Sequence, residues 1–184
     1  ASAAGQYESI ANITSRDGLL PAINRCFASY NDSGAVQYRR DRNLPETFMA
    51  VLVQQQIRGV FSGVAFSRDP ISQQGCDVVI EALPGNASKV VSGQATPESY
   101  RVFVEESLFQ IQHSSQSWIL PDDVVLPVEG SGDVPERLIQ QVAYLARHLE
   151  NHFSGIPQDI EWSYDGQTLW LLQARPVTTL LPIW

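Results

Sequence analysis

Apolar residues recur at helical spacing in two stretches of the chain. The stretch nearer the N-terminus predicts a helix over about residues 18–30, followed by a short helix that should end near Arg42, before Pro45. The stretch nearer the C-terminus predicts a helix from Val134 to about Phe153. Asp133 is its expected N-cap, Glu136 completes a capping box, and Gly155 is its expected stop. Its apolar stripe consists of Leu138, Val142, Leu145, Leu149 and Phe153.

Between these helices the chain is rich in β-branched and aromatic residues, separated by Pro and Gly. This pattern predicts strands at 48–56, 60–68, 78–82, 100–105 and 108–112, followed by a loop over 114–132. The order helix, strands, helix, hairpin predicts an α+β fold with a largely antiparallel sheet flanked by helices.

A final pair of strands places polar residues at every second position. Asp159 and Glu161 share one face of the first strand, and Gln173 and Arg175 share one face of the second. If these four side chains converge, they offer the oxygen and nitrogen groups that a magnesium-phosphate site requires. A surface hairpin with a cross-strand ion pair explains the spacing equally well.

The register of this hairpin decides whether the four side chains converge. A two-residue turn at Asp165-Gly166 would put Gln173 and Glu161 on opposite faces. A connection of five residues, 165–169, instead places Glu161 opposite Gln173 and Asp159 opposite Arg175. The second register is preferred, because it also gathers apolar residues on a core side, namely Ile160, Trp162, Trp170 and Leu172.

Composition and charge narrow the class of function. The 184 residues are 43% hydrophobic, enough for a sizeable core, and acidic residues outnumber basic ones 20 to 12 for a net charge of −8. A basic face for nucleic acid is therefore not expected, whereas a divalent cation can join a carboxylate to a polyphosphate. The two cysteines lack metal-site spacing, and no apolar run is long enough to span a bilayer, so a cytoplasmic protein is expected.

Several blocks, in order, resemble the nucleotide-binding domain of the phosphoenolpyruvate synthase and pyruvate phosphate dikinase family, which has an ATP-grasp fold. Besides the hairpin, the matching segments are Gly5-Gln6-Tyr7-Glu8-Ser9, Met49-Ala50-Val51-Leu52-Val53-Gln54, Gly63-Val64-Ala65-Phe66-Ser67-Arg68-Asp69-Pro70 and Val91-Ser92-Gly93-Gln94-Ala95-Thr96-Pro97-Glu98.

The resemblance implies ATP and Mg²⁺ as ligands. Glu161 and Gln173 match the family's magnesium ligands, Arg175 matches the arginine that contacts the phosphoryl groups, and Asp159 matches a supporting acid. The hinge that holds adenine, mainly through backbone groups, corresponds to Gln54, Gln56 and Ile57.

The chain departs from the family pattern in two places. The usual Gly-Leu-Gly-Glu is replaced by the loop Pro84-Gly85-Asn86-Ala87-Ser88. The family's N-terminal subdomain, with its phosphate-binding lysine, is absent, so residues 1–184 are expected to be a partial ATP-grasp domain, inactive alone. Implied partners are that subdomain and a domain bearing a phosphohistidine carrier. A degenerate nucleotide-binding or association module is the alternative.

Five other residues carry weaker signals. Glu81 is a minor candidate for the site, because its strand is expected to border the ligand. Arg68 and Asp69 fit an ion pair in a turn better than a phosphate contact. His148, four residues before His152, fits a solvated helix end better than a metal ligand, since no third ligand accompanies the pair.

Overall fold

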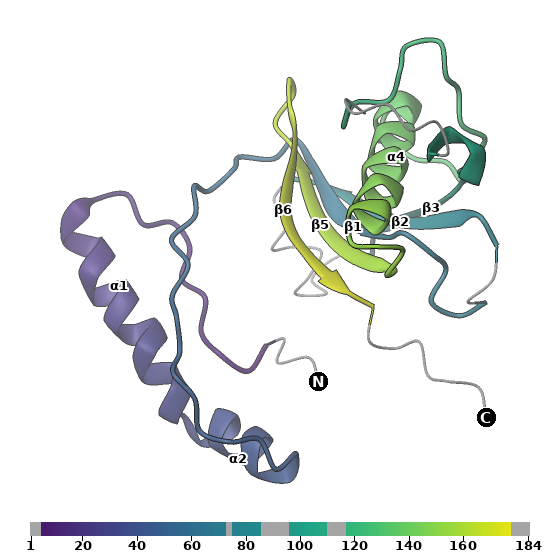
Figure 1. Ribbon diagram of the computed structural model, residues 1–184. Coiled ribbons are helices and arrows are strands. Elements are labelled where there is room, and N and C mark those ends of the chain that lie inside the picture. Colours follow the sequence, from purple (N-terminus) through teal and green to yellow (C-terminus); the bar gives the residue numbers. More distant parts are fainter. Residues whose placement is uncertain (1–4, 73–74, 86–95, 110–116, 178–184) are drawn as a thin grey trace. The chain divides into compact units, whose positions relative to one another are not determined.

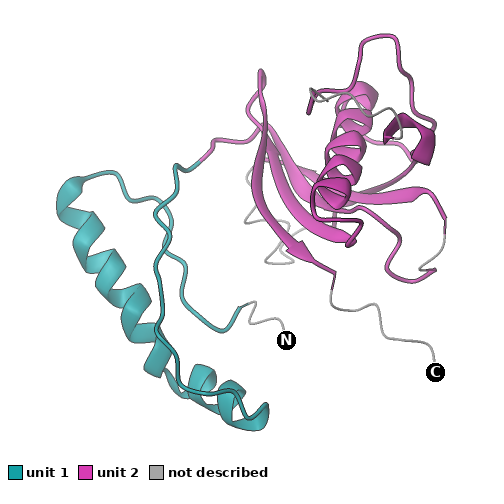
Figure 2. Ribbon diagram, in the orientation of Figure 1, with its two compact units in different colours: residues 1–56 teal, residues 57–184 magenta. Residues whose placement is uncertain are grey.

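The computed structural model describes residues 5–72, 75–85, 96–109 and 117–177. The chain divides into two compact units, residues 1–56 and residues 57–184 (Figure 2). Each unit is described by itself below.

The first unit contains helices α1 (Arg16–Ala28), η1 (Ser29–Asn31) and α2 (Ser33–Asp41). Helix α1 begins where the Ser15 side chain accepts a hydrogen bond from the backbone N–H of Gly18. Both predicted helices are thus confirmed. The apolar residues of α1 form no core, however, because none of them is buried and Phe27 is 44% exposed.

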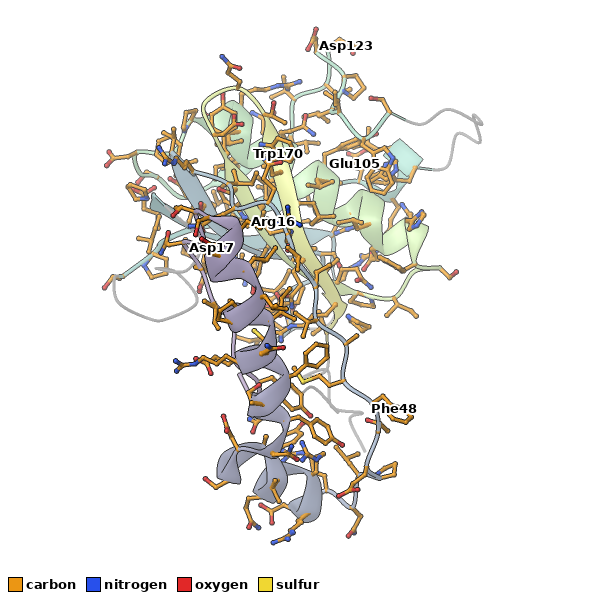
Figure 3. The ribbon with its side chains drawn as sticks, turned by 90° about the vertical axis from the view of Figure 1, so that its left-hand side faces the viewer. Arg16, Asp17, Phe48, Glu105, Asp123 and Trp170 are labelled. Atoms are coloured by element: carbon orange, nitrogen blue, oxygen red, sulfur yellow. The ribbon has the colours of Figure 1, made fainter. Side chains whose placement is uncertain are left out.

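The strand predicted over residues 48–56 is wrong. This segment is extended but pairs with no other strand in the described part of the chain. Its side chains Leu52 and Val53 are exposed, and Phe48 projects away from the ribbon into open space (Figure 3). A β-rich composition predicts a strand only where a neighbouring strand supplies backbone partners, and here none does.

The second unit is built on a six-stranded antiparallel sheet, and the predicted α+β fold is confirmed. The strand order is β4-β3-β2-β1-β5-β6. Its strands are β1 (Phe61–Phe66), β2 (Asp77–Pro84), β3 (Glu98–Phe103), β4 (Val128–Glu129), β5 (Gln158–Tyr164) and β6 (Leu169–Pro176).

Helix α4 (Glu136–His152) lies across one face of this sheet (Figure 1). The predicted capping box does not form, because the helix begins two residues later, with Pro135 as N-cap. The carboxylate of Glu98 instead accepts hydrogen bonds from the backbone N–H groups of Asp133 and Val134. At the other end, Gly155 has a φ of +81° and donates its N–H to the carbonyl of Glu150, as a glycine stop requires.

The core lies between α4 and the sheet. Trp162, Ile160 and Ile80 are fully buried there, together with Val142 and Ile139 of the helix. Burying each large apolar side chain contributes about 1.5–3 kcal/mol, so this layer holds the sheet and α4 together.

Gly63 allows Trp162 to pack across β1. A Cβ atom on Gly63 would come within 2.9 Å of Cζ2 of Trp162 and would collide with the backbone carbonyl oxygen of Glu81. Only a residue without a side chain fits at this crossing.

Two further predictions are corrected. Residues 106–109 form the 3-10 helix η2 (Glu106–Phe109) where a strand over 108–112 was expected, and residues 110–112 lie outside the described part. The expected loop over 114–132 contains the short strand β4. Among the described helices, none combines the length and apolar character that crossing a membrane requires.

Candidate functional site

The site residues lie on the face of the sheet opposite α4. Ile160 and Trp162 of β5 point into the core, so Asp159 and Glu161, which alternate with them, occupy the other face. The buried layer therefore fixes where the two acids point.

The register of the β5–β6 hairpin brings the four polar residues together. Glu161 lies directly opposite Gln173, and Asp159 lies directly opposite Arg175. Directly opposed side chains have Cβ atoms about 5 Å apart. The preferred register is confirmed at these positions.

The route to this register differs from the prediction. The turn contains four residues, since Tyr164 pairs with Leu169 and Trp162 with Leu171. The register then shifts between Trp162 and Glu161, and Leu172 is the extra residue of a β-bulge on β6. Without this bulge, Gln173 would pair with Ile160 and face the core.

The bulge also corrects the expected core side of β6. Trp170 pairs with Ser163 on the polar face, is 38% exposed, and donates its indole N–H to Oδ2 of Asp165 at 2.9 Å. Figure 3 shows this side chain on β6. Leu172 is the bulged residue, so neither residue completes the core as predicted.

Arg175 and Asp159 form a two-point ion pair. The Nε and Nη2 atoms of Arg175 lie 3.0 and 2.9 Å from Oδ2 of Asp159. The carboxylate is largely buried, with its side chain 14% exposed, whereas the arginine side chain is 40% exposed. Asp159 thus orients a guanidinium that still reaches solvent.

Glu161 and Gln173 have no side-chain hydrogen bond to any other described residue. Burial raises the pKa of Glu161 above its usual range; the charge of Arg175 opposes this shift, and the charge of Asp159 adds to it. A half-buried carboxylate with a raised pKa gains from a nearby cation, because the cation offsets the cost of desolvating the charge.

Glu81 lies in the same row of the polar face. Val64 of β1 pairs with Glu81 on one side and with Glu161 on the other. Strands are about 4.8 Å apart, so the two carboxylates stand on strands about 10 Å apart. The composition of the strand alone gave Glu81 only weak support, and sheet order is what places it here.

The three residues predicted to hold adenine lie at the boundary between the units. Gln56 ends the first unit and Ile57 begins the second. The side-chain amide of Gln56 accepts from the backbone N–H of Asn12 at 2.7 Å and donates to the Asn12 side chain at 3.0 Å. Gln54 and Gln56 are exposed, and Ile57 is half-buried.

Arg68 and Asp69 do not pair with each other, contrary to the prediction. Arg68 contacts Glu150 and Glu106, and Asp69 pairs with Arg101 at 2.6 Å. The guanidinium of Arg68 is thereby occupied away from the hairpin. These ion pairs connect α4, η2 and β3 to the segment after β1.

The expectation that His148 is solvated is wrong. It is 8% exposed and lies 4.1 Å, between ring centroids, from Trp118. The pair with His152 therefore belongs to an aromatic cluster under the 117–120 segment, where burial lowers the pKa of His148.

The donor set of the hairpin suits a hard cation and a phosphate. A carboxylate and an amide oxygen are ligands that Mg²⁺ accepts, and a guanidinium neutralises phosphate charge. No group of three or more His, Cys, Asp or Glu side chains gathers at metal-binding distance among the described residues. A cation held here would therefore take its remaining ligands from water or from a phosphate.

Comparison with known proteins gives concordant matches. A family model described as "Pyruvate phosphate dikinase, AMP/ATP-binding domain" matches residues 1–181. The phosphoenolpyruvate synthase of Pyrococcus furiosus is 31% identical, over 98% of the chain and 24% of the relative. The rifampicin phosphotransferase of Bacillus subtilis is 30% identical, over 100% of the chain and 22% of the relative.

A third relative is a probable phosphoenolpyruvate synthase of Methanocaldococcus jannaschii, 30% identical over 98% of the chain and 16% of the relative. The chain thus spans 16–24% of the length of these three relatives. Most of the length of each of these relatives therefore has no counterpart in these 184 residues.

Proposed function

Because the chain belongs to the family of pyruvate phosphate dikinase AMP/ATP-binding domains, we propose that its β5–β6 hairpin binds the phosphates of ATP through Mg²⁺. Glu161 and Gln173 supply the two oxygen ligands, and Arg175 contacts the transferred phosphoryl group. The observation that carries this proposal is the register, which puts all four polar residues on one face within reach of each other.

Each residue has a separate role. Glu161 has a raised pKa and no hydrogen-bond partner among the described residues, so a cation is the partner that its carboxylate lacks. Arg175 neutralises the charge that collects on phosphate oxygens in the transition state. Asp159 holds Arg175 in place and contacts no phosphate itself.

The adenine is proposed to lie against the extended segment that contains Gln54, Gln56 and Ile57. The Gln56 side chain is bonded to Asn12, and the base is proposed to be recognised mainly by backbone groups of the segment. A backbone N–H group can donate to a ring nitrogen of adenine, and a backbone C=O group can accept from its amino group.

In the whole protein, we infer that phosphoryl from ATP passes to a carrier histidine on another domain. A nitrogen–phosphorus bond forms to the imidazole while a phosphorus–oxygen bond of the nucleotide breaks. Pyruvate, a glucan or an antibiotic would be the final acceptor, chosen by parts outside this chain. The 184 residues alone are expected to show no turnover, and a measurable rate of ATP-dependent transfer by them would contradict this.

Titration of MgATP into the whole protein by calorimetry tests the site. We expect Glu161→Gln to weaken binding at least about tenfold, because it removes the charged ligand of the cation. Glu105→Gln is the matched control, since Glu105 is exposed and outside the hairpin. Equal affinities of the Glu161→Gln variant and the wild type would remove Glu161 from the site.

A non-catalytic nucleotide-binding or association module remains the alternative, supported by the Pro84–Ser88 loop that lacks the family's Gly-Leu-Gly-Glu. Residues 86–88 of this loop lie outside the described part. Incubation of the whole protein with isotopically labelled ATP, followed by detection of labelled phosphoprotein, separates the two functions. Binding without any phosphoprotein would favour the module.

A further inference from the structure

Gly59 lies where the chain enters the sheet, and its backbone is packed against two strands. A Cβ atom on Gly59 would be 2.7 Å from the carbonyl oxygen of Gly85 and closer still to the hydroxyl oxygens of Ser62 and Ser163. No side chain fits at these separations. The contact therefore requires glycine for its lack of volume.

The two serines beneath Gly59 form a closed set of hydrogen bonds. Ser62 and Ser163 are 0% and 1% exposed, and their Oγ atoms are 2.8 Å apart. Ser62 also donates its hydroxyl to the carbonyl of Gly85 at 2.5 Å. A buried hydroxyl is costly unless bonded, so these contacts fix the three segments relative to each other.

Backbone hydrogen bonds secure the next residue on both sides. The N–H of Val60 donates to the carbonyl of Tyr164 at 2.7 Å, and the N–H of Gly85 donates to the carbonyl of Val60 at 2.8 Å. Residues 59–60 are thus held between β5 and the end of β2. We call the set Gly59, Ser62, Gly85 and Ser163 the glycine joint.

The glycine joint is adjacent to the proposed site on two sides. Ser163 is two residues from Glu161 on the same face of β5, and Ser62 is two residues from Val64, which separates Glu161 from Glu81. Ile57 precedes Gly59 by two residues. A displacement at Gly59 would therefore move Ile57 relative to the phosphate-binding hairpin.

We propose that the glycine joint positions Ile57 for the adenine base, with Gly59 as the positioning residue. This inference rests on the proposed function, because it concerns the base end of the same nucleotide. Gly59 itself contacts no nucleotide. It allows the backbone to approach the serine pair closely, which fixes the point at which the chain from Ile57 joins the sheet.

The test compares MgATP with magnesium tripolyphosphate, which offers the same phosphates without a base. In the whole protein, we expect Gly59→Ala to weaken MgATP binding at least about tenfold, since small displacements of a binding segment have large effects. Binding of magnesium tripolyphosphate should change less than about twofold, because Glu161, Gln173 and Arg175 are not among the residues nearest the added methyl group. Gly34→Ala, where the added Cβ atom would approach no described residue from elsewhere in the chain within 4 Å, is the matched glycine control and should leave both affinities unchanged.

A second variant guards against a simple loss of folding. Ser62→Ala keeps the space but removes both hydroxyl contacts, and it should weaken MgATP several-fold without affecting tripolyphosphate. If either variant weakens both ligands equally, or neither ligand, the joint has no positioning role. If the wild type binds neither ligand, the proposed function itself fails, which is a different result.

Discussion

Glu161 lies directly opposite Gln173 across the β5–β6 hairpin, immediately beyond the bulge at Leu172. The carboxylate is half-buried and its pKa is raised by burial, whereas the amide is exposed. A carboxylate in this setting is less stable as an anion than it would be in water, and a bound cation would reverse that penalty. The pair is therefore suited to binding a cation. In the absence of the cation, the ionised carboxylate lowers the stability of the folded protein.

This relationship predicts a pH-dependent effect of Glu161→Gln on stability. As the pH rises, Glu161 ionises in the unfolded chain before it ionises in the folded protein, which favours unfolding. The ligand-free variant should therefore be more stable than the wild type at neutral pH. The difference should open as the pH rises through the usual glutamate range and vanish in acid, where the carboxyl is protonated in both states.

Thermal unfolding without nucleotide, from acid to neutral pH, measures this difference. Glu105→Gln serves as the control, because Glu105 is exposed. A Glu161→Gln variant that is less stable than the wild type at neutral pH would contradict the raised pKa.

The ion pair between Arg175 and Asp159 predicts a loss of stability for Asp159→Asn. The substitution weakens two charge-assisted contacts of 3.0 and 2.9 Å, and we expect about 1–2 kcal/mol after allowing for the solvent-exposed arginine. Chemical denaturation of Asp159→Asn, Arg175→Gln and the double variant gives the coupling energy. Strictly additive effects would show that the pair contributes nothing as a pair.

The bulge on β6 predicts opposite outcomes for two single-residue deletions. Removing Leu172 leaves Gln173 opposite Glu161 and Arg175 opposite Asp159, so MgATP binding should stay within about tenfold of the wild type. Removing Ala174 sends Arg175 to the core face, and binding should fall by about 100-fold or more. Calorimetric titration of the two variants measures both effects. Similar losses in the two deletions would refute the assigned register.

The crossing of Trp162 over Gly63 predicts a destabilised Gly63→Ala variant. The new methyl group would meet the tryptophan ring at 2.9 Å and the carbonyl of Glu81, so we expect a loss of about 2–3 kcal/mol. Val64→Ala, the adjacent half-buried position on the other face, should lose only about 1 kcal/mol. Urea denaturation followed by tryptophan fluorescence compares the two variants, and equal losses would show that Gly63 has no special packing role.

Local patterns predicted the elements whose signal lies within the segment itself. Helix α4 follows from its apolar stripe, and the alternation of β5 correctly separates Asp159 and Glu161 from Ile160 and Trp162. Patterns failed where the outcome depends on distant partners. The 48–56 segment has the composition of a strand but no neighbour in the described chain, and Asp133 lost its capping role to contacts with Glu98 of β3.

The sequence by itself determined the chemistry of the site: which acids, amide and guanidinium are present, and that alternation places them in pairs on their own strands. The tertiary structure decided which pairs meet. A bulge at Leu172 reconciles a four-residue turn with the register that opposes Glu161 to Gln173, and the order of strands brings Glu81 into the same row. Alternation is a property of each backbone, whereas register and strand order are set by packing of the whole sheet against α4, where Trp162 and Ile160 are buried.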